Sequence, residues 1–146
     1  MKFDNIHSDT DCRCISSKCV ENTEDVFCHA LRSADVTEND FRSLWEDGRY
    51  GQQHVPCSET CERKGVSINI LTTENEAAIK MKYAGIVTQK FKPRQRRFTH
   101  YCTFKFVAGC GKVLHTPRND DPYHYTFFKC DAFKIEQLSL LSTQSL

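Results

Sequence analysis

The chain has 146 residues, of which 39% are hydrophobic and 27% charged, with a formal net charge of +1. This length fits a single domain over residues 1–146, and the composition is typical of a folded protein rather than a disordered one. No run of about 18 apolar residues occurs, which argues against a transmembrane helix.

The N-terminal segment, residues 1–33, is rich in cysteine and poor in large apolar side chains. We expect irregular structure there, with one helical turn around residues 26–31. The first residues lack the apolar stretch of a secretory signal, so we expect a cytoplasmic location. Disulfides are rare in that reducing compartment, and an odd total of nine cysteines fits a fully paired framework badly.

Two short helices are expected in the next part of the chain, on either side of a strand. Residues 37–48, TENDFRSLWEDG, offer Thr37 as an N-cap and an apolar face at helical spacing. Residues 66–72, VSINILT, alternate and are β-branched, which predicts a strand. Residues 73–84 begin with the capping box Thr73/Glu76 and precede Gly85, which predicts a second helix.

The C-terminal half is dominated by strand patterns. We expect strands at residues 86–91, 98–107 and 123–135, and a hairpin from the second of these through the GCGK turn into residues 113–115. The tail, residues 136–146, reads as a short helix or a frayed end. With the core at 34–135, this order predicts an α+β fold, in which short helices and a Cys-rich irregular N-terminal segment pack on a mostly antiparallel sheet.

The small net charge conceals two opposite regions. Residues 1–76 hold 15 acidic and 8 basic side chains, whereas residues 77–119 hold ten basic and no acidic ones. Basic residues interleaved with aromatic ones are the ingredients of a single-strand nucleic-acid surface, and charge asymmetry also suits an acidic protein partner. Solvation, or neutralisation by the acidic half within the fold, would explain the same pattern. The candidate contact residues are Lys90, Lys92, Arg94, Arg96, Arg97, Lys105 and Arg118.

The stretch HVPCSETCERKG, residues 54–65, spaces potential metal ligands closely. Zinc takes four thiolate or imidazole ligands, often two to four residues apart in the chain. His54, Cys57 and Cys61 meet that spacing in what we expect to be a loop, but they need partners from the N-terminal segment. The candidates there are Cys12, Cys14, Cys19, Cys28 and His29. A structural zinc and ordinary reduced thiols are both consistent with this pattern.

His115 and His124 flank a polar loop, which suggests an enzyme as a second hypothesis. Two histidines and a nearby cation are enough for metal-independent cleavage of a phosphodiester, with one histidine as base and the other as acid. The sequence contains no P-loop, dinucleotide fingerprint, GxSxG or HExxH motif.

The favoured interpretation is a small cytoplasmic binding protein. Its basic β surface, residues 80–118, would contact a polyanion such as nucleic acid, or an acidic protein. The alternatives are an RNase-like enzyme using His115 and His124, and an inhibitor that recognises one partner by charge complementarity.

Overall fold

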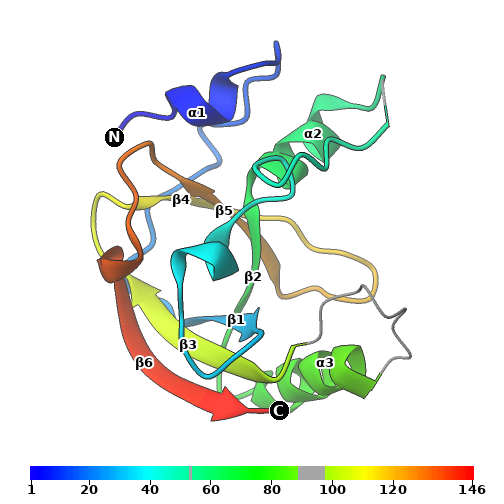
Figure 1. Cartoon of the computed structure of the whole chain (residues 1–146), viewed down its shortest axis with the longest axis vertical. Helices are drawn as coiled ribbons and strands as arrows, with labels where there is room; N and C mark the ends of the chain where they lie inside the picture. Colours follow the sequence, from blue (N-terminus) through cyan, green and yellow to red (C-terminus); the bar gives the residue numbers. More distant parts are fainter. Residues whose placement is uncertain (53, 89–97) are drawn as a thin grey trace.

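The computed structural model describes residues 1–52, 54–88 and 98–146 (Figure 1). Six strands form one antiparallel sheet in the order β4-β5-β2-β1-β3-β6, which confirms the α+β prediction. Figure 1 shows α3 at one end of the sheet and α1 and α2 at the other. The elements are α1 (Asp4–His7), β1 (Phe27–Leu31), η1 (Glu38–Phe41), α2 (Cys57–Lys64), β2 (Val66–Ile70), α3 (Glu76–Thr88), β3 (His100–Phe106), β4 (Gly111–His115), β5 (His124–Lys129), η2 (Ile135–Gln137) and β6 (Leu138–Ser145).

Strands β2 and β3 form where the alternating and β-branched patterns predict them. Strand β5 covers only the first half of the strand predicted at 123–135, because the chain turns at residues 131–132 and η2 follows. Two other predictions are wrong. Residues 27–31 are not a helical turn but β1, a central strand buried on both faces, so its side chains lack the alternation that identifies a half-buried strand. The tail is not a helix or a frayed end but β6, which pairs with β3 along its whole length.

The expected hairpin between β3 and β4 does not form. Strand β4 pairs with β5, and β3 pairs with β1 and β6. The GCG turn carries the chain across the sheet instead, with Gly109 at φ +85°. A Cβ atom on Gly111 would lie 2.3 Å from the carbonyl oxygen of Phe128, so only glycine allows this close approach.

The helices also differ from their predicted bounds. Thr37 and Asp40 form the N-terminal capping box of η1, but the helix ends at Phe41. Ser43 and Glu46 exchange hydrogen bonds of 3.0 and 3.1 Å and start a separate turn. Helix α3 begins after a different cap, Thr72 with Asn75, and continues to Thr88. The strand predicted at 86–91 is therefore wrong at 86–88, and 89–97 lie outside the described residues.

Each face of the sheet packs against a different part of the chain. One face carries a cluster of buried phenylalanines, with ring centroids as close as 4.3 Å between Phe106 and Phe127, and Phe41 from η1 covers it. The other face is covered by α3 at one end and, around Phe128, by the N-terminal segment. The Cys-rich segment thus packs on the sheet, as predicted.

A buried polar network fastens α3 to the sheet. Asp121 is 3% exposed, and its carboxylate accepts hydrogen bonds of 2.8 and 3.0 Å from the side chain of Asn69 of β2. The same carboxylate forms an ion pair with Lys82 of α3. Tyr83 donates to the Asn69 side chain at 2.9 Å. Burial alone would raise the pKa of Asp121, but the hydrogen bonds from Lys82 and Asn69 outweigh it and lower that pKa.

Candidate functional site

A cleft opens where the two central strands of the sheet separate. Strands β1 and β2 pair only at Phe27↔Ile70 and Cys28↔Asn69. Beyond that point β1 continues against β3, and β2 against β5. Hydrogen-bonded pairs alternate along an antiparallel ladder, so Ala30 and Ser67 would be the next bonded pair in this register. Their backbone groups face the cleft instead.

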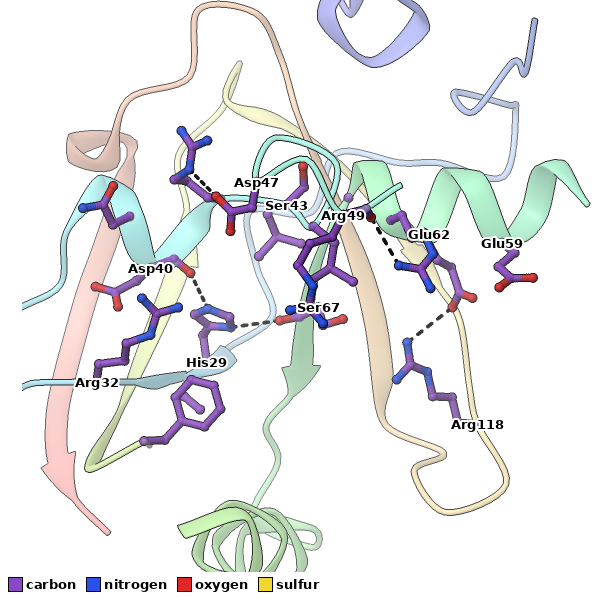
Figure 2. Close-up of a pocket in the computed structure, with 18 of the residues that line it drawn as sticks. His29, Arg32, Asp40, Ser43, Asp47, Arg49, Glu59, Glu62, Ser67 and Arg118 are labelled. Carbon is purple, nitrogen blue, oxygen red and sulfur yellow. Dashed lines mark hydrogen bonds and ion pairs between the residues drawn. The ribbon is translucent and has the colours of Figure 1, made fainter. Parts of the chain in front are cut away.

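The imidazole of His29 occupies the break in the ladder (Figure 2). Its Nδ1 lies 2.8 Å from the carbonyl oxygen of Ser67, and its Nε2 lies 2.6 Å from that of Asp40. The ring therefore takes the place of a backbone donor towards β2 and links η1 to the sheet. Burial lowers the pKa of His29, although the two carbonyl oxygens act in the opposite direction.

Five arginines and four acidic residues of the described chain line this central cleft, whose volume is about 1260 Å³. Among the residues that the structure describes, Arg32, Arg49 and Arg63 form no ion pair, and the Nε atoms of Arg32 and Arg63 are buried without a hydrogen-bond partner. Arg118 lies a loose 3.8 Å from Glu62. Figure 2 shows Arg32 and Arg118 on either side of His29 and Ser67.

Three of the four acidic residues of the cleft already have partners. Asp40 caps η1 through a 2.8 Å bond to the backbone of Thr37, and Asp47 pairs with Arg42 at 2.7 Å. The Arg63 side chain also donates to the carbonyl oxygen of Arg49 at 3.2 Å, so its Nε is the unsatisfied atom. Buried N–H groups without partners are costly unless something satisfies them. The arrangement can therefore take up an anionic group, with arginine side chains and free backbone N–H groups as donors.

We expect the protein to lose stability as the pH falls below about 6.5, the usual pKa of histidine. Burial lowers the pKa of both His29 and His124, so the unfolded chain binds these protons at a pH where the folded chain does not. Each histidine can remove at most about 1.4 kcal/mol per pH unit. Urea unfolding at pH 7.5 and 5.5 measures the loss, which should shrink in the variant His29→Gln/His124→Gln. An undiminished loss in that variant would contradict the assignment.

Two of the seven predicted contact residues, Lys105 and Arg118, lie among the described residues. Lys105 follows Phe104 on β3 and so points away from the phenylalanine cluster, whereas Arg118 lines the cleft. Lys80, Lys82 and Arg118 pair with carboxylates that lie outside the acid-free stretch: Glu76, Asp121 and Glu62. The other predicted contact residues, Lys90, Lys92, Arg94, Arg96 and Arg97, lie outside the described part of the chain.

His115 and His124 do not converge. His115 pairs with Tyr125 across β4 and β5 and shares its face of the sheet, whereas His124 precedes Tyr125 and lies on the opposite face. His115 Nε2 contacts the carbonyl oxygen of Pro122, and the buried ring of His124 contacts Thr116. The two rings thus lie on opposite faces of the sheet with different partners, and the structure does not show them sharing a site.

Four cysteines of the candidate zinc site form disulfides, which corrects the expectation of free thiols. Cys12 is bonded to Cys57 and Cys14 to Cys61. Cys57 and Cys61 lie on α2 rather than in a loop. The N-terminal segment and residues 54–65 thus meet, as the zinc hypothesis requires, but the sulfur atoms are paired with each other.

The remaining candidate ligands lie in different surroundings. Cys19 is buried near Cys14, to whose carbonyl oxygen its thiol donates at 3.6 Å. Cys28 lies in β1, where burial raises its pKa to about 12. His54 lines a second cavity of about 560 Å³. Within the described residues, no group of three or more His, Cys, Asp or Glu side chains is arranged to hold a metal in this disulfide-bonded form.

Comparison with protein families, curated proteins and solved structures finds no match for this chain. No helix in the described ranges is long and apolar enough to cross a membrane. The site must therefore be interpreted from its own geometry.

Apart from Arg118, the residues of the central cleft were not predicted from the sequence as a binding site. The sequence predicts His29 only as a possible zinc ligand. Arg32 and Arg63 lie in the acidic half of the chain, where isolated basic residues do not indicate a site. A signal did exist: His29 stands in an otherwise apolar pentapeptide, FCHAL. A polar residue within a buried strand needs a partner, but the sequence does not reveal which one.

Proposed function

We propose that this protein binds an acidic segment of another protein, in an extended conformation, in the central cleft. The observation that carries the proposal is the interrupted ladder between β1 and β2, because Ala30 and Ser67 do not pair with each other there. His29 already occupies the carbonyl oxygen of Ser67, so the backbone groups of Ala30 and the N–H of Ser67 are the ones that an added strand would use. An added strand can bond to such groups along its main chain, while pockets beside it recognise the side chains. Of the two partners that the charge pattern suggests, a polyanion and an acidic protein, the cleft favours the acidic protein.

The arginines give the proposed segment its acidic character. Arg32 and Arg63 have buried Nε atoms that lack partners, and a carboxylate can accept two parallel bonds from one guanidinium. The volume of about 1260 Å³ exceeds that of a usual small-molecule pocket and suits several residues of a peptide. Glu59 and Glu62 line the same cleft and disfavour a long polyanion with one charge on every unit.

We expect an extended peptide of alternating Glu and Val to bind, and its Lys and Val counterpart not to bind. Fluorescence anisotropy measures the affinity. In NMR spectra of the protein, the backbone amide signals of Ala30 and Ser67 should shift when the peptide binds. The variant Arg32→Gln/Arg63→Gln should bind at least about tenfold more weakly, because each lost charge-assisted hydrogen bond contributes roughly 1.5–3 kcal/mol.

The matched control is Arg13→Gln, which removes an exposed arginine outside the cleft and should leave binding unchanged. Single-stranded RNA serves as the competing probe. Tighter binding of RNA than of the acidic peptide, or peptide binding that survives the double substitution, would overturn the proposal.

The cytoplasmic location favoured by the sequence remains a proposal. Two disulfides are more typical of an oxidising compartment, because cytosolic thiol systems keep cysteines reduced. Binding of an acidic segment does not depend on the compartment, since the arginines of the cleft keep their charge in either one.

A further inference from the structure

The four disulfide-bonded cysteines bring their sulfur atoms into one small volume. Cys57 and Cys61 are one turn apart on α2, and Cys12 and Cys14 flank an exposed Arg13, so both of their side chains turn towards α2. The paired Cα atoms are 5.4 and 5.3 Å apart. Two parallel bridges between the same two segments place four sulfurs side by side.

We propose that, in the reduced protein, Cys12, Cys14, Cys57 and Cys61 bind one Zn²⁺ ion as a structural site. Four cysteine thiolates in a tetrahedral set are a standard closed zinc site, with Zn–S distances of about 2.3 Å. The spacing within each pair, two residues and four residues, lets each segment present both sulfurs to one ion.

The interconversion balances with a dithiol as reductant. Two dithiol molecules supply four electrons and four protons, so both disulfide bonds break, four cysteine thiols form and each reductant becomes a cyclic disulfide. The four thiols then release four protons to solvent as they bind Zn²⁺. Cys57 is the first residue of α2, where the helix N-terminus favours a thiolate.

The segment is held against α2 by contacts that do not involve sulfur. The buried Nζ of Lys64, at the end of α2, donates to the carbonyl oxygens of Ile6 and Ser8 at 2.6 and 2.5 Å. On the other side of the two cysteines, Val20 and Val113 exchange backbone hydrogen bonds of 3.0 and 2.8 Å. Residues 12 and 14 therefore remain close to α2 after reduction, which lowers the entropy cost of forming the site.

The N-terminal segment would be tied to α2 in both the oxidised and the reduced protein, by different bonds. An oxidising compartment ties the N-terminal segment to α2 by disulfides, and a reducing one ties it by zinc. Helix α2 supplies Glu62 and Arg63 to the central cleft, so the cleft keeps its wall in either state. The zinc site does not depend on what the cleft binds.

The test uses the full chain, prepared with and without a dithiol and supplied with Zn²⁺ or Co²⁺ alone. We expect the reduced protein to hold one equivalent of zinc and the oxidised protein none. With Co²⁺, the reduced protein should show the intense absorption of a tetrahedral all-thiolate site. In X-ray absorption, the zinc should show only sulfur neighbours at about 2.3 Å.

Substitutions and alkylation locate the site. The variant Cys12→Ser/Cys14→Ser should lose the metal, whereas Cys130→Ser, which removes a buried free thiol elsewhere, should retain it. Should the first variant fail to fold, alkylation of the unsubstituted protein still decides, because zinc should protect residues 12, 14, 57 and 61. Reduced protein without stoichiometric zinc, zinc with nitrogen or oxygen neighbours, or zinc that leaves these four cysteines open to alkylation would overturn the inference.

Discussion

Replacing Asp121 by Ala should lower the free energy of unfolding by about 3 kcal/mol or more. The substitution removes the acceptor for Asn69 and the partner of Lys82 in one step. Asn69 is 3% exposed and cannot turn to water, so its amide would remain buried without a partner. Lys82 is partly exposed and can reach solvent, which keeps the cost from rising further.

Urea unfolding monitored by circular dichroism measures this loss. The matched control is Asp120→Ala, which removes the neighbouring carboxylate at an exposed position and should change stability little. The variant Asp121→Asn should be intermediate, because it keeps an acceptor for Asn69 and loses only the charge. Equal stability of the Asp121→Ala and Asp120→Ala variants would contradict the role of the network.

Local sequence patterns predicted a strand where its two faces carry different kinds of side chain. They failed where both faces of the strand are buried and carry similar side chains. Strand β3 alternates between the phenylalanine cluster and the α3 face, so its sequence shows the period of a strand. Strand β1 is buried on both faces, and its five residues carry no period at all. Residues 138–145 form β6 because they pair with the edge of β3 that β1 leaves unpaired. That edge is a property of the assembled sheet, so the sequence of the tail does not indicate it.

The candidate site was less accessible to sequence reasoning than the fold. The cleft exists because β1 and β2 share only two pairs, and pairing partners far apart in sequence cannot be read from local patterns. Residues 54–65, in contrast, could be recognised from the sequence as a region of interest. Their spacing correctly drew attention to Cys57 and Cys61, but spacing alone cannot distinguish thiolates on a metal from sulfurs in a disulfide.

Removing both disulfides should cost far more stability than removing either one. The bridges span 45 and 47 residues, and closing a loop of that size in the unfolded chain corresponds to about 4 kcal/mol. Once one bridge is present, the other closes a ring of only a few residues, which corresponds to about 2 kcal/mol. We therefore expect about 2 kcal/mol for the loss of one bridge and about 6 kcal/mol for the loss of both.

The two single-bridge variants and the double variant separate these contributions. Cys12→Ser/Cys57→Ser and Cys14→Ser/Cys61→Ser each serve as the control for the other, because they remove the same atoms one turn apart on α2. Unfolding in urea under oxidising conditions, with a chelator to exclude metals, isolates the effect of the bridges. Equal losses for one bridge and for both would show that the N-terminal segment is held by its packing on Phe128 and by Lys64, with the sulfur bonds adding little.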